Sequence, residues 1–128
     1  MSVRIVRLGS ARRPGEGLRI GTVRRPPRGV AKSDFARHDW YDVWYPLLSP
    51  TPATVKLGLT ADTDAKWAAF TRKFRGEMSA PEASRTLDLL AALSHHANFS
   101  IGCYCQDESR CHRSVLRSLL EERGAKVF

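Results

Sequence analysis

Two short segments near the start of the chain mix apolar residues with arginines at a short period. Residues 3–8 and 18–23 both follow this pattern, which is typical of half-buried β-strands. The glycine-rich segment 9–17 between them predicts a turn. The proline pair in segment 24–30 removes backbone donors, so we expect a loop where the second strand ends.

Apolar residues then recur at the spacing of helices. Five aromatic residues within 33–45, some one helical turn apart, predict a short helix that Pro46 ends. Segment 47–59 holds two further prolines and predicts irregular structure. A longer helix is predicted next, with Thr60 or Asp62 as its N-cap and Gly76 just past its end. Its apolar face is an aromatic stripe formed by Trp67, Phe70 and Phe74.

The last third of the chain predicts a helix, a strand and another helix. A capping-box pattern at 79–82 begins the first helix, residues 99–105 form a largely buried strand, and an apolar stripe over 115–120 indicates the second helix. A short strand at 126–128 follows. This order predicts a single α/β domain over residues 1–128, Rossmann-like, with a small parallel or mixed sheet flanked by helices. Ligands of such sheets bind at the carboxyl ends of the strands.

Basic residues outnumber acidic ones by 21 to 13, which gives a net charge of +8. Most of the excess lies in the first third of the chain, and such charge attracts nucleotides, nucleic acid or acidic partners, although solubility explains it equally well. The N-terminus lacks the apolar run of a signal peptide or membrane span. Three cysteines confined to 103–111 favour a reducing compartment. We therefore expect a cytoplasmic protein without a membrane partner.

The densest chemistry lies between Cys103 and Ser114, where the buried strand leads into the last helix. With Asp107 or Ser109 as the N-cap, Arg110, Cys111 and His112 occupy the first helical turn, whose free amides favour an anion. The same surroundings favour the thiolate form of Cys111. A nucleophilic or redox Cys111 and a buried, inert Cys111 are equally compatible with the sequence.

Two other chemistries are less favoured. A zinc site would use Cys103, Cys105, Cys111 and His112. Neighbouring side chains on a helix diverge by about 100°, so we expect no metal and no other cofactor. A tyrosine-phosphatase-like spacing runs from Cys111 to Arg117. The intervening amides would be bonded within the helix, so they would not be free to bind phosphate.

Two motifs resemble the signatures of the domain-of-unknown-function 488 family, small α/β proteins of bacteria and archaea. The run Cys103-Tyr-Cys followed by Cys111-His-Arg-Ser-Val-Leu is similar to its C-terminal signature, and 19–32 with Trp40 is similar to its N-terminal one. The chain departs from the pattern at Val23, where many relatives have an acid, and at Pro26, where they have tryptophan. The family motif positions fall on Arg24, Pro27, Arg28, Gly29, Lys32, Trp40, Cys103, Cys111, His112 and Arg113.

Both signatures follow strands, so the resemblance implies that they meet at one sheet edge and form a cationic cleft of phosphate size. We expect this cleft to bind a phosphorylated or otherwise anionic ligand, a nucleotide or nucleic acid, with Cys111 and His112 as candidates for catalysis. A nonenzymatic nucleic-acid-binding module and a thiol redox or metal-sensing protein are the alternatives. The expected ligand contacts are Arg24, Arg28, Lys32, Trp40, Cys103, Arg110, Arg113 and Ser114.

Overall fold

Four parallel β-strands form the sheet in the computed structural model, which describes residues 1–128. The strands are β1 (Val3–Arg7), β2 (Leu18–Gly21), β3 (Val43–Trp44) and β4 (Phe99–Cys103), in the spatial order β1-β4-β2-β3. Every residue of β4 is buried, because β4 pairs with β1 on one side and β2 on the other. The α/β fold with a parallel sheet is therefore confirmed. The expected strand at 126–128 is reduced to one bridge between Val3 and Val127.

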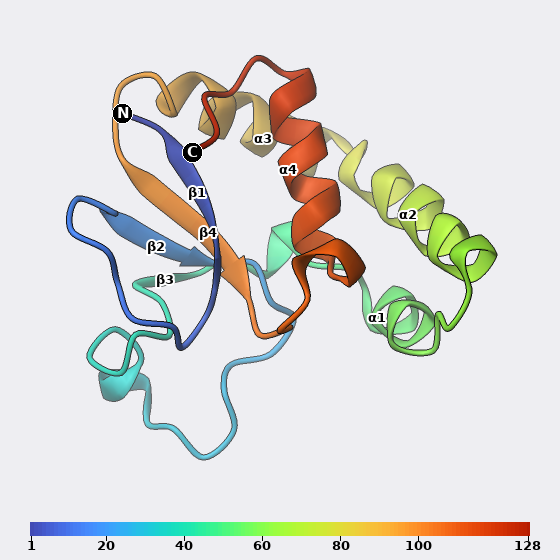
Figure 1. Ribbon diagram of the computed structural model, residues 1–128, viewed down its shortest axis with the longest axis horizontal. Helices are drawn as coiled ribbons and strands as arrows, with labels where there is room; N and C mark the ends of the chain where they lie inside the picture. The colour runs from blue at the N-terminus through green and yellow to red at the C-terminus, as the bar shows by residue number, and fades with distance from the viewer.

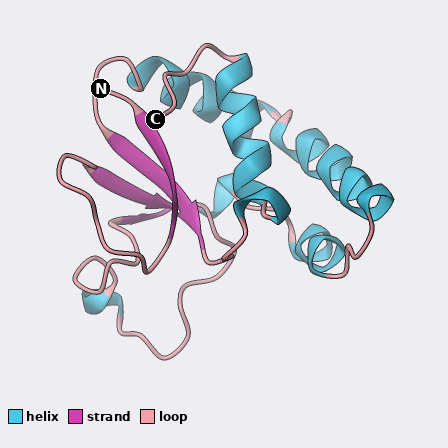
Figure 2. Ribbon diagram, viewed as in Figure 1, coloured by secondary structure: helices cyan, strands magenta, loops and turns pink.

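Four α-helices lie on one side of this sheet (Figure 1). They are α1 (Pro52–Leu59), α2 (Asp64–Met78), α3 (Pro81–Leu93) and α4 (His112–Glu122). Short 3-10 helices occur at η1 (Lys32–Asp34), η2 (Pro46–Leu48) and η3 (Glu108–Arg110). Figure 2 shows that most of the connection between β2 and β3 is irregular loop. No helix combines the length and the apolar composition needed to cross a lipid bilayer.

Two apolar clusters hold the domain together. The larger one joins the sheet to the helices, through residues such as Ile101 of β4, Phe74 of α2 and Leu116 of α4. Burial of each such side chain contributes about 1.5–3 kcal/mol before cavity effects are counted. The smaller cluster lies beyond the carboxyl ends of the strands and consists of Leu8, Val23, Tyr41, Cys103 and Cys111. The smaller cluster supports the candidate site.

The prediction of a helix over 33–45 is wrong. The segment forms η1, several turns and β3, and Asp39 adopts a left-handed backbone with φ of 62° that interrupts any helix. Tyr41 packs directly on Gly21, where a Cβ atom would lie 2.9 Å from the ring carbon Cγ. The indole of Trp44 donates a hydrogen bond to the carbonyl of Val23 at 2.8 Å. The aromatic residues therefore fasten the edge of the sheet instead of forming a helical stripe.

Several predicted helix boundaries also need correction. Segment 47–59 is not irregular, because Pro52 occupies the first position of α1, where a missing N–H costs nothing. The cap of α2 is Thr63, whose hydroxyl accepts the N–H of Lys66, and Gly76 lies inside that helix. Ser79 ends α2, so it does not cap α3, although α3 begins within the predicted capping box.

Asp42 joins the loop before β2 to the strand itself. Its carboxylate accepts two hydrogen bonds from the guanidinium of Arg12, at 2.8 and 3.1 Å, and one from the backbone N–H of Arg19 at 2.7 Å. Burial alone would raise the pKa of Asp42, but these three donors outweigh it and hold that pKa below its ordinary value. The folded state therefore releases this proton more readily than the unfolded state does.

We expect Asp42→Asn to lower the free energy of unfolding by about 1.5 kcal/mol at neutral pH, since it weakens hydrogen bonds to a charged acceptor. The stabilisation is fully present above the unfolded pKa of about 4 and is lost as pH falls through the lower folded pKa. Urea unfolding over a pH series should show the gap to wild type closing on acidification. Asp62→Asn, which removes the exposed ion pair with Lys66, is the control and should change little. A gap that does not depend on pH would contradict the assignment.

Candidate functional site

The carboxyl ends of three parallel strands open into one cleft of about 1000 Å³. Arg7 at the end of β1, segment 24–28 after β2 and segment 103–105 at the end of β4 all line it. The opposite wall is apolar and includes Pro52 and Val55 of α1. The proline-arginine loop and the cysteine segment, which the resemblance placed together, do line the same cleft. The position matches the rule that ligands of parallel sheets bind beyond the strand ends.

The lining of the cleft is strongly cationic. It contains Arg7, Arg24, Arg25 and Arg28 and no carboxylate. Arg24 has a structural task, because its Nε donates to the carbonyl of Pro50 at 3.0 Å and a terminal nitrogen donates to that of Ser49 at 3.1 Å. Arg25 and Arg28 are exposed, and their guanidinium groups form no hydrogen bond or ion pair within the chain. Two guanidinium groups are thus free to bind an anion.

Aromatic side chains form another part of the wall. Trp40 and Tyr104 both line the cleft and pack edge to face, with ring centroids 5.8 Å apart. Trp40 also packs closely on Gly9, where a Cβ atom would lie 3.0 Å from the indole. The hydroxyl of Tyr104 donates to the carbonyl of Arg25 at 2.9 Å, and burial raises the pKa of Tyr104, so this donor stays protonated. The contacts with Gly9 and Tyr104 fix the indole of Trp40 in the cleft wall, and the hydrogen bond from Tyr104 connects the arginine loop to the end of β4.

The start of α4 differs from the expected cap. Asp107 caps only η3, where its carboxylate accepts the N–H of Ser109 at 3.0 Å. Cys111 is the residue that precedes α4, with an extended backbone at φ −130° and ψ 151°, and α4 begins at His112. Arg110 and Cys111 therefore lie outside the first turn of the helix, because the 3-10 turn ends before the α-helix begins.

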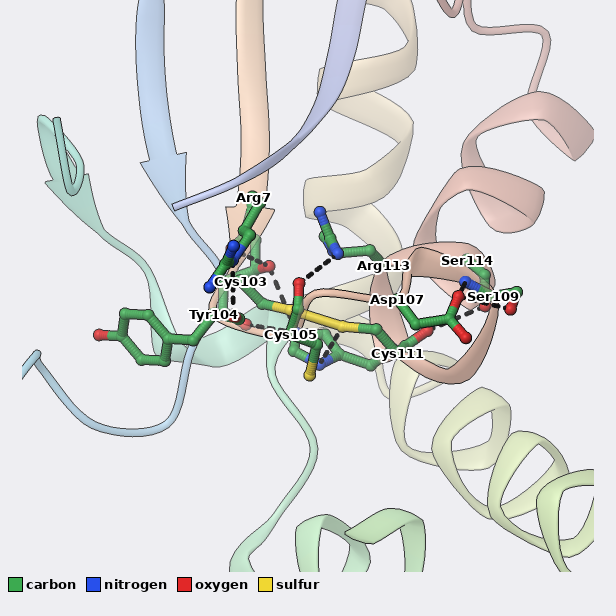
Figure 3. The surroundings of a disulfide bond; sticks show 12 residues. Arg7, Cys103, Tyr104, Cys105, Asp107, Ser109, Cys111, Arg113 and Ser114 are labelled. Carbon is green, nitrogen blue, oxygen red and sulfur yellow. Dashed lines mark hydrogen bonds between the residues drawn. A yellow bond between two sulfur atoms is a disulfide. The ribbon is translucent and has the colours of Figure 1, made fainter. Parts of the chain in front are cut away.

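Two sulfur atoms and one imidazole converge at this junction. Cys103 and Cys111 are joined by a disulfide, and Cys105 is a free thiol (Figure 3). Nε2 of His112 lies 2.6 Å from the carbonyl oxygen of Thr22, and its Nδ1 lies 3.9 Å from Sγ of Cys111. The ligand atoms of Cys103, Cys111 and His112 all lie within 4.8 Å of one another. These three residues are the set that is able to hold a metal ion.

The imidazole of His112 is neutral over the physiological range. Burial lowers the pKa of His112 to about 4, and the nearby charge of Arg113 lowers it further, while the hydrogen bond to Thr22 opposes both. A carbonyl oxygen only accepts hydrogen bonds, so the proton of the neutral ring is on Nε2. Nδ1 therefore presents a lone pair toward the sulfur of Cys111.

The structure brings together some of the expected site residues and separates others. Arg24, Arg28, Trp40, Cys103 and His112 line the cleft, and Cys111 is buried just outside its lining. The other four expected residues have different surroundings. Arg113 is buried, and its guanidinium donates a hydrogen bond to the carbonyl of Cys105 at 2.6 Å (Figure 3). Arg110 forms an ion pair with Asp64 of α2 at 2.6 Å, and the hydroxyl of Ser114 donates to the carbonyl of Cys111 at 2.9 Å. Lys32 is exposed on η1.

Of the charged and aromatic residues in the lining, three were not predicted from the sequence: Arg7, Arg25 and Tyr104. Arg7 and Tyr104 each directly end or follow a strand, and Arg25 is next to a residue that had been singled out. The signal was available, because parallel strands end at the same sheet edge and the residues after them must share it. The family motif positions do not include any of these three residues.

A protein-family model described as the active DUF488-N3 subclade matches residues 3–124. No curated protein and no solved structure matches the chain. The family match includes both of the motifs that contribute residues to the cleft lining, and it spans nearly the whole sequence. The chain belongs to the DUF488 family.

Proposed function

We propose that the cleft binds a phosphorylated small molecule of the nucleotide class. The observation that carries this proposal is the pair of unpartnered guanidinium groups, Arg25 and Arg28, in a lining that contains no carboxylate. The planar guanidinium matches the geometry of a phosphate group and forms hydrogen bonds stronger than those between neutral groups. An anion in this cleft would meet only favourable charge.

The remaining walls favour a nucleotide over a bare anion. Trp40 presents an aromatic ring beside the arginine loop, and base stacking on such rings contributes about 1–3 kcal/mol per base. The wall formed by α1 is apolar, and the volume of about 1000 Å³ is large enough for a ligand of this size. We therefore infer that the phosphate of the ligand binds to Arg25 and Arg28 and that its base stacks on Trp40.

A reaction on the bound ligand is part of the proposal. The family model that matches the chain is described as an active subclade. A catalytic group must touch the ligand, and His112 lines the cleft whereas Cys111 is buried outside its lining. We therefore assign the catalytic contact to His112. Incubation with AMP or ATP, followed by mass spectrometry, should show conversion by the wild type and none by His112→Asn.

Arg25→Ala and Arg28→Ala are each expected to weaken binding of AMP by about ten- to a hundredfold. Each variant removes a charge-assisted hydrogen bond of about 1.5–3 kcal/mol, and 1.4 kcal/mol corresponds to a factor of ten. Isothermal titration calorimetry with inorganic phosphate, AMP and ATP measures the effect. Arg37→Ala is the matched control, because Arg37 is 78% exposed and lies outside the cleft. Its affinity should equal that of the wild type.

Titration with a short single-stranded oligonucleotide separates a nucleotide from a nucleic acid. A nucleic-acid-binding surface would bind the oligonucleotide with a steep salt dependence, because each phosphate contact releases counterions. Tight oligonucleotide binding without AMP binding would replace the proposed ligand class. Wild-type affinity for AMP in both arginine variants, or the absence of any AMP and phosphate binding, would overturn the proposal.

A further inference from the structure

Cys103, Cys111 and His112 form a donor set that is separate from Arg25, Arg28 and Trp40, the residues proposed to bind the nucleotide. A tetrahedral zinc ion has Zn–S bonds of about 2.3 Å and Zn–N bonds of about 2.0 Å, which place its donor atoms about 3.5–3.8 Å apart. The observed separation between Nδ1 of His112 and Sγ of Cys111 is 3.9 Å. All three donor atoms lie within 4.8 Å of one another. The imidazole is therefore already at a distance from the sulfur that a shared metal ion requires.

The orientation of His112 is the second observation. Its Nε2 donates to the carbonyl oxygen of Thr22, at the end of β2, over 2.6 Å. This bond fixes the ring and leaves the lone pair of Nδ1 directed at the sulfur atoms. Histidine ligands of metal ions are held in the same way, with the other ring nitrogen donating to a carbonyl or carboxylate.

The backbone at Cys111 removes the geometric objection to a metal site. The divergence of about 100° applies to two neighbours within a helix. Cys111 is not helical, because its φ of −130° and ψ of 151° are extended, and only His112 belongs to α4. The two side chains consequently converge, and Cys103 at the end of β4 completes the set.

We propose that the reduced protein binds one Zn²⁺ ion through Cys103, Cys111 and His112. Two thiolates and one imidazole favour zinc over magnesium or calcium, which prefer oxygen ligands. Cys103 and His112 line the cleft, so an ion between them borders it. Three protein ligands leave the fourth position of a tetrahedral ion for water or a ligand in the cleft. This inference does not rest on the proposed function.

The disulfide between Cys103 and Cys111 is the oxidised form of the same site. A dithiol reductant supplies two electrons and two protons, which cleave the S–S bond and give two thiols, while the reductant becomes a disulfide. Zn²⁺ then displaces both thiol protons as it binds the thiolates. Oxidised protein has no thiolate in this set and should not bind the ion.

The test uses the full chain, reduced with a dithiol, stripped of metal and kept without oxygen. Titration with Co²⁺ should give the visible bands of a tetrahedral ion and a near-ultraviolet sulfur-to-cobalt charge-transfer band, both of which saturate at one ion per chain. Zn²⁺ should abolish these bands, and native mass spectrometry should show one zinc per chain. Reduced wild type that takes up no stoichiometric Co²⁺ or Zn²⁺ would overturn the proposal.

Variants identify the ligands. Replacing a residue that only hydrogen-bonds to a metal ligand weakens metal affinity by about 10–100-fold. His112 and Cys111 are proposed as direct ligands, so His112→Ala and Cys111→Ser should each weaken the affinity for Co²⁺ by more than about a hundredfold. Cys105→Ser is the matched control, since Cys105 is the free thiol and lies outside the donor set. It should retain the cobalt spectrum. A spectrum lost in Cys105→Ser and retained in Cys111→Ser would overturn the assignment.

Arg28→Ala separates this result from the test of the nucleotide site. Arg28 lines the cleft but is no part of the donor set, so this variant should bind Co²⁺ like the wild type. Failure of the wild type to bind AMP, together with an intact cobalt spectrum, would contradict the nucleotide proposal alone. AMP binding by a reduced protein that takes up no metal would contradict the zinc proposal alone.

Discussion

Replacing Arg19 with methionine is expected to lower the free energy of unfolding by about 3–5 kcal/mol, the cost of breaking a buried ion pair from one side. Arg19 is fully buried in β2, and one terminal nitrogen lies 3.0 Å from both carboxylate oxygens of Glu16. Glu16 is itself only 3% exposed. The variant would leave its charge buried without a partner. Urea unfolding at neutral pH measures the loss.

The double variant Arg19→Met/Glu16→Gln is the informative control. It removes both charges, and replacement of a complete buried ion pair is often nearly neutral, so it should be more stable than Arg19→Met alone. Equal stability of the single and double variants would contradict an uncompensated charge as the cause. Arg12→Met is a second control, because Arg12 retains solvent contact, and should cost less.

Arg19 also links this pair to the cleft. Its other terminal nitrogen donates to the carbonyl of Ser10 at 2.9 Å and to that of Asp39 at 2.7 Å. Ser10 lines the cleft, and Asp39 directly precedes Trp40. Arg19 is thus a positioning residue for the aromatic wall. With Trp44→Phe and Trp67→Phe as the background, so that Trp40 is the remaining tryptophan, we expect the fluorescence of Arg19→Met to report a more mobile Trp40 under conditions in which the chain is still folded.

The sequence predicted the elements whose local pattern agrees with their packing. β1, β2 and β4 are short apolar segments, and α2 and α4 have apolar stripes that face the larger cluster. The helix predicted over 33–45 does not form. The aromatic spacing of this segment suits a helix, but its contacts with β2 determine its structure. Helix spacing within a short segment is weak evidence when residues far away in sequence supply the packing.

The candidate site was predictable in place but not in detail. Two segments that follow strands were expected to meet at one sheet edge, which is a consequence of parallel topology. Which arginine points into the cleft depends on tertiary contacts: Arg113 and Arg19 are buried, whereas Arg25 and Arg28 are exposed. All four have the same chemistry in the sequence. The convergence of Cys111 and His112 depends on one extended residue before α4, which no composition pattern indicates.

Gly17→Ala is expected to lower the free energy of unfolding by about 3 kcal/mol or more, because strain in the backbone adds to a steric clash. Gly17 has φ of +81°, and a Cβ atom there would overlap the carbonyl oxygen of Asn98 and lie 2.7 Å from its carbonyl carbon. These residues precede β2 and β4, which pair from Leu18 and Phe99 onward. The methyl group must therefore force the two central strands apart where their ladder begins.

Gly15→Ala separates the clash from the backbone strain. Gly15 lies in the same turn and has a similar φ of +76°, but a Cβ atom there would have no neighbour within 4 Å. This variant should cost only about 1–2 kcal/mol, the penalty for an L-residue in a left-handed conformation. Urea unfolding of both variants gives the difference directly. Equal losses of stability in the two variants would show that β2 and β4 tolerate the extra methyl group. The close approach to Asn98 would then not be the reason for glycine at position 17.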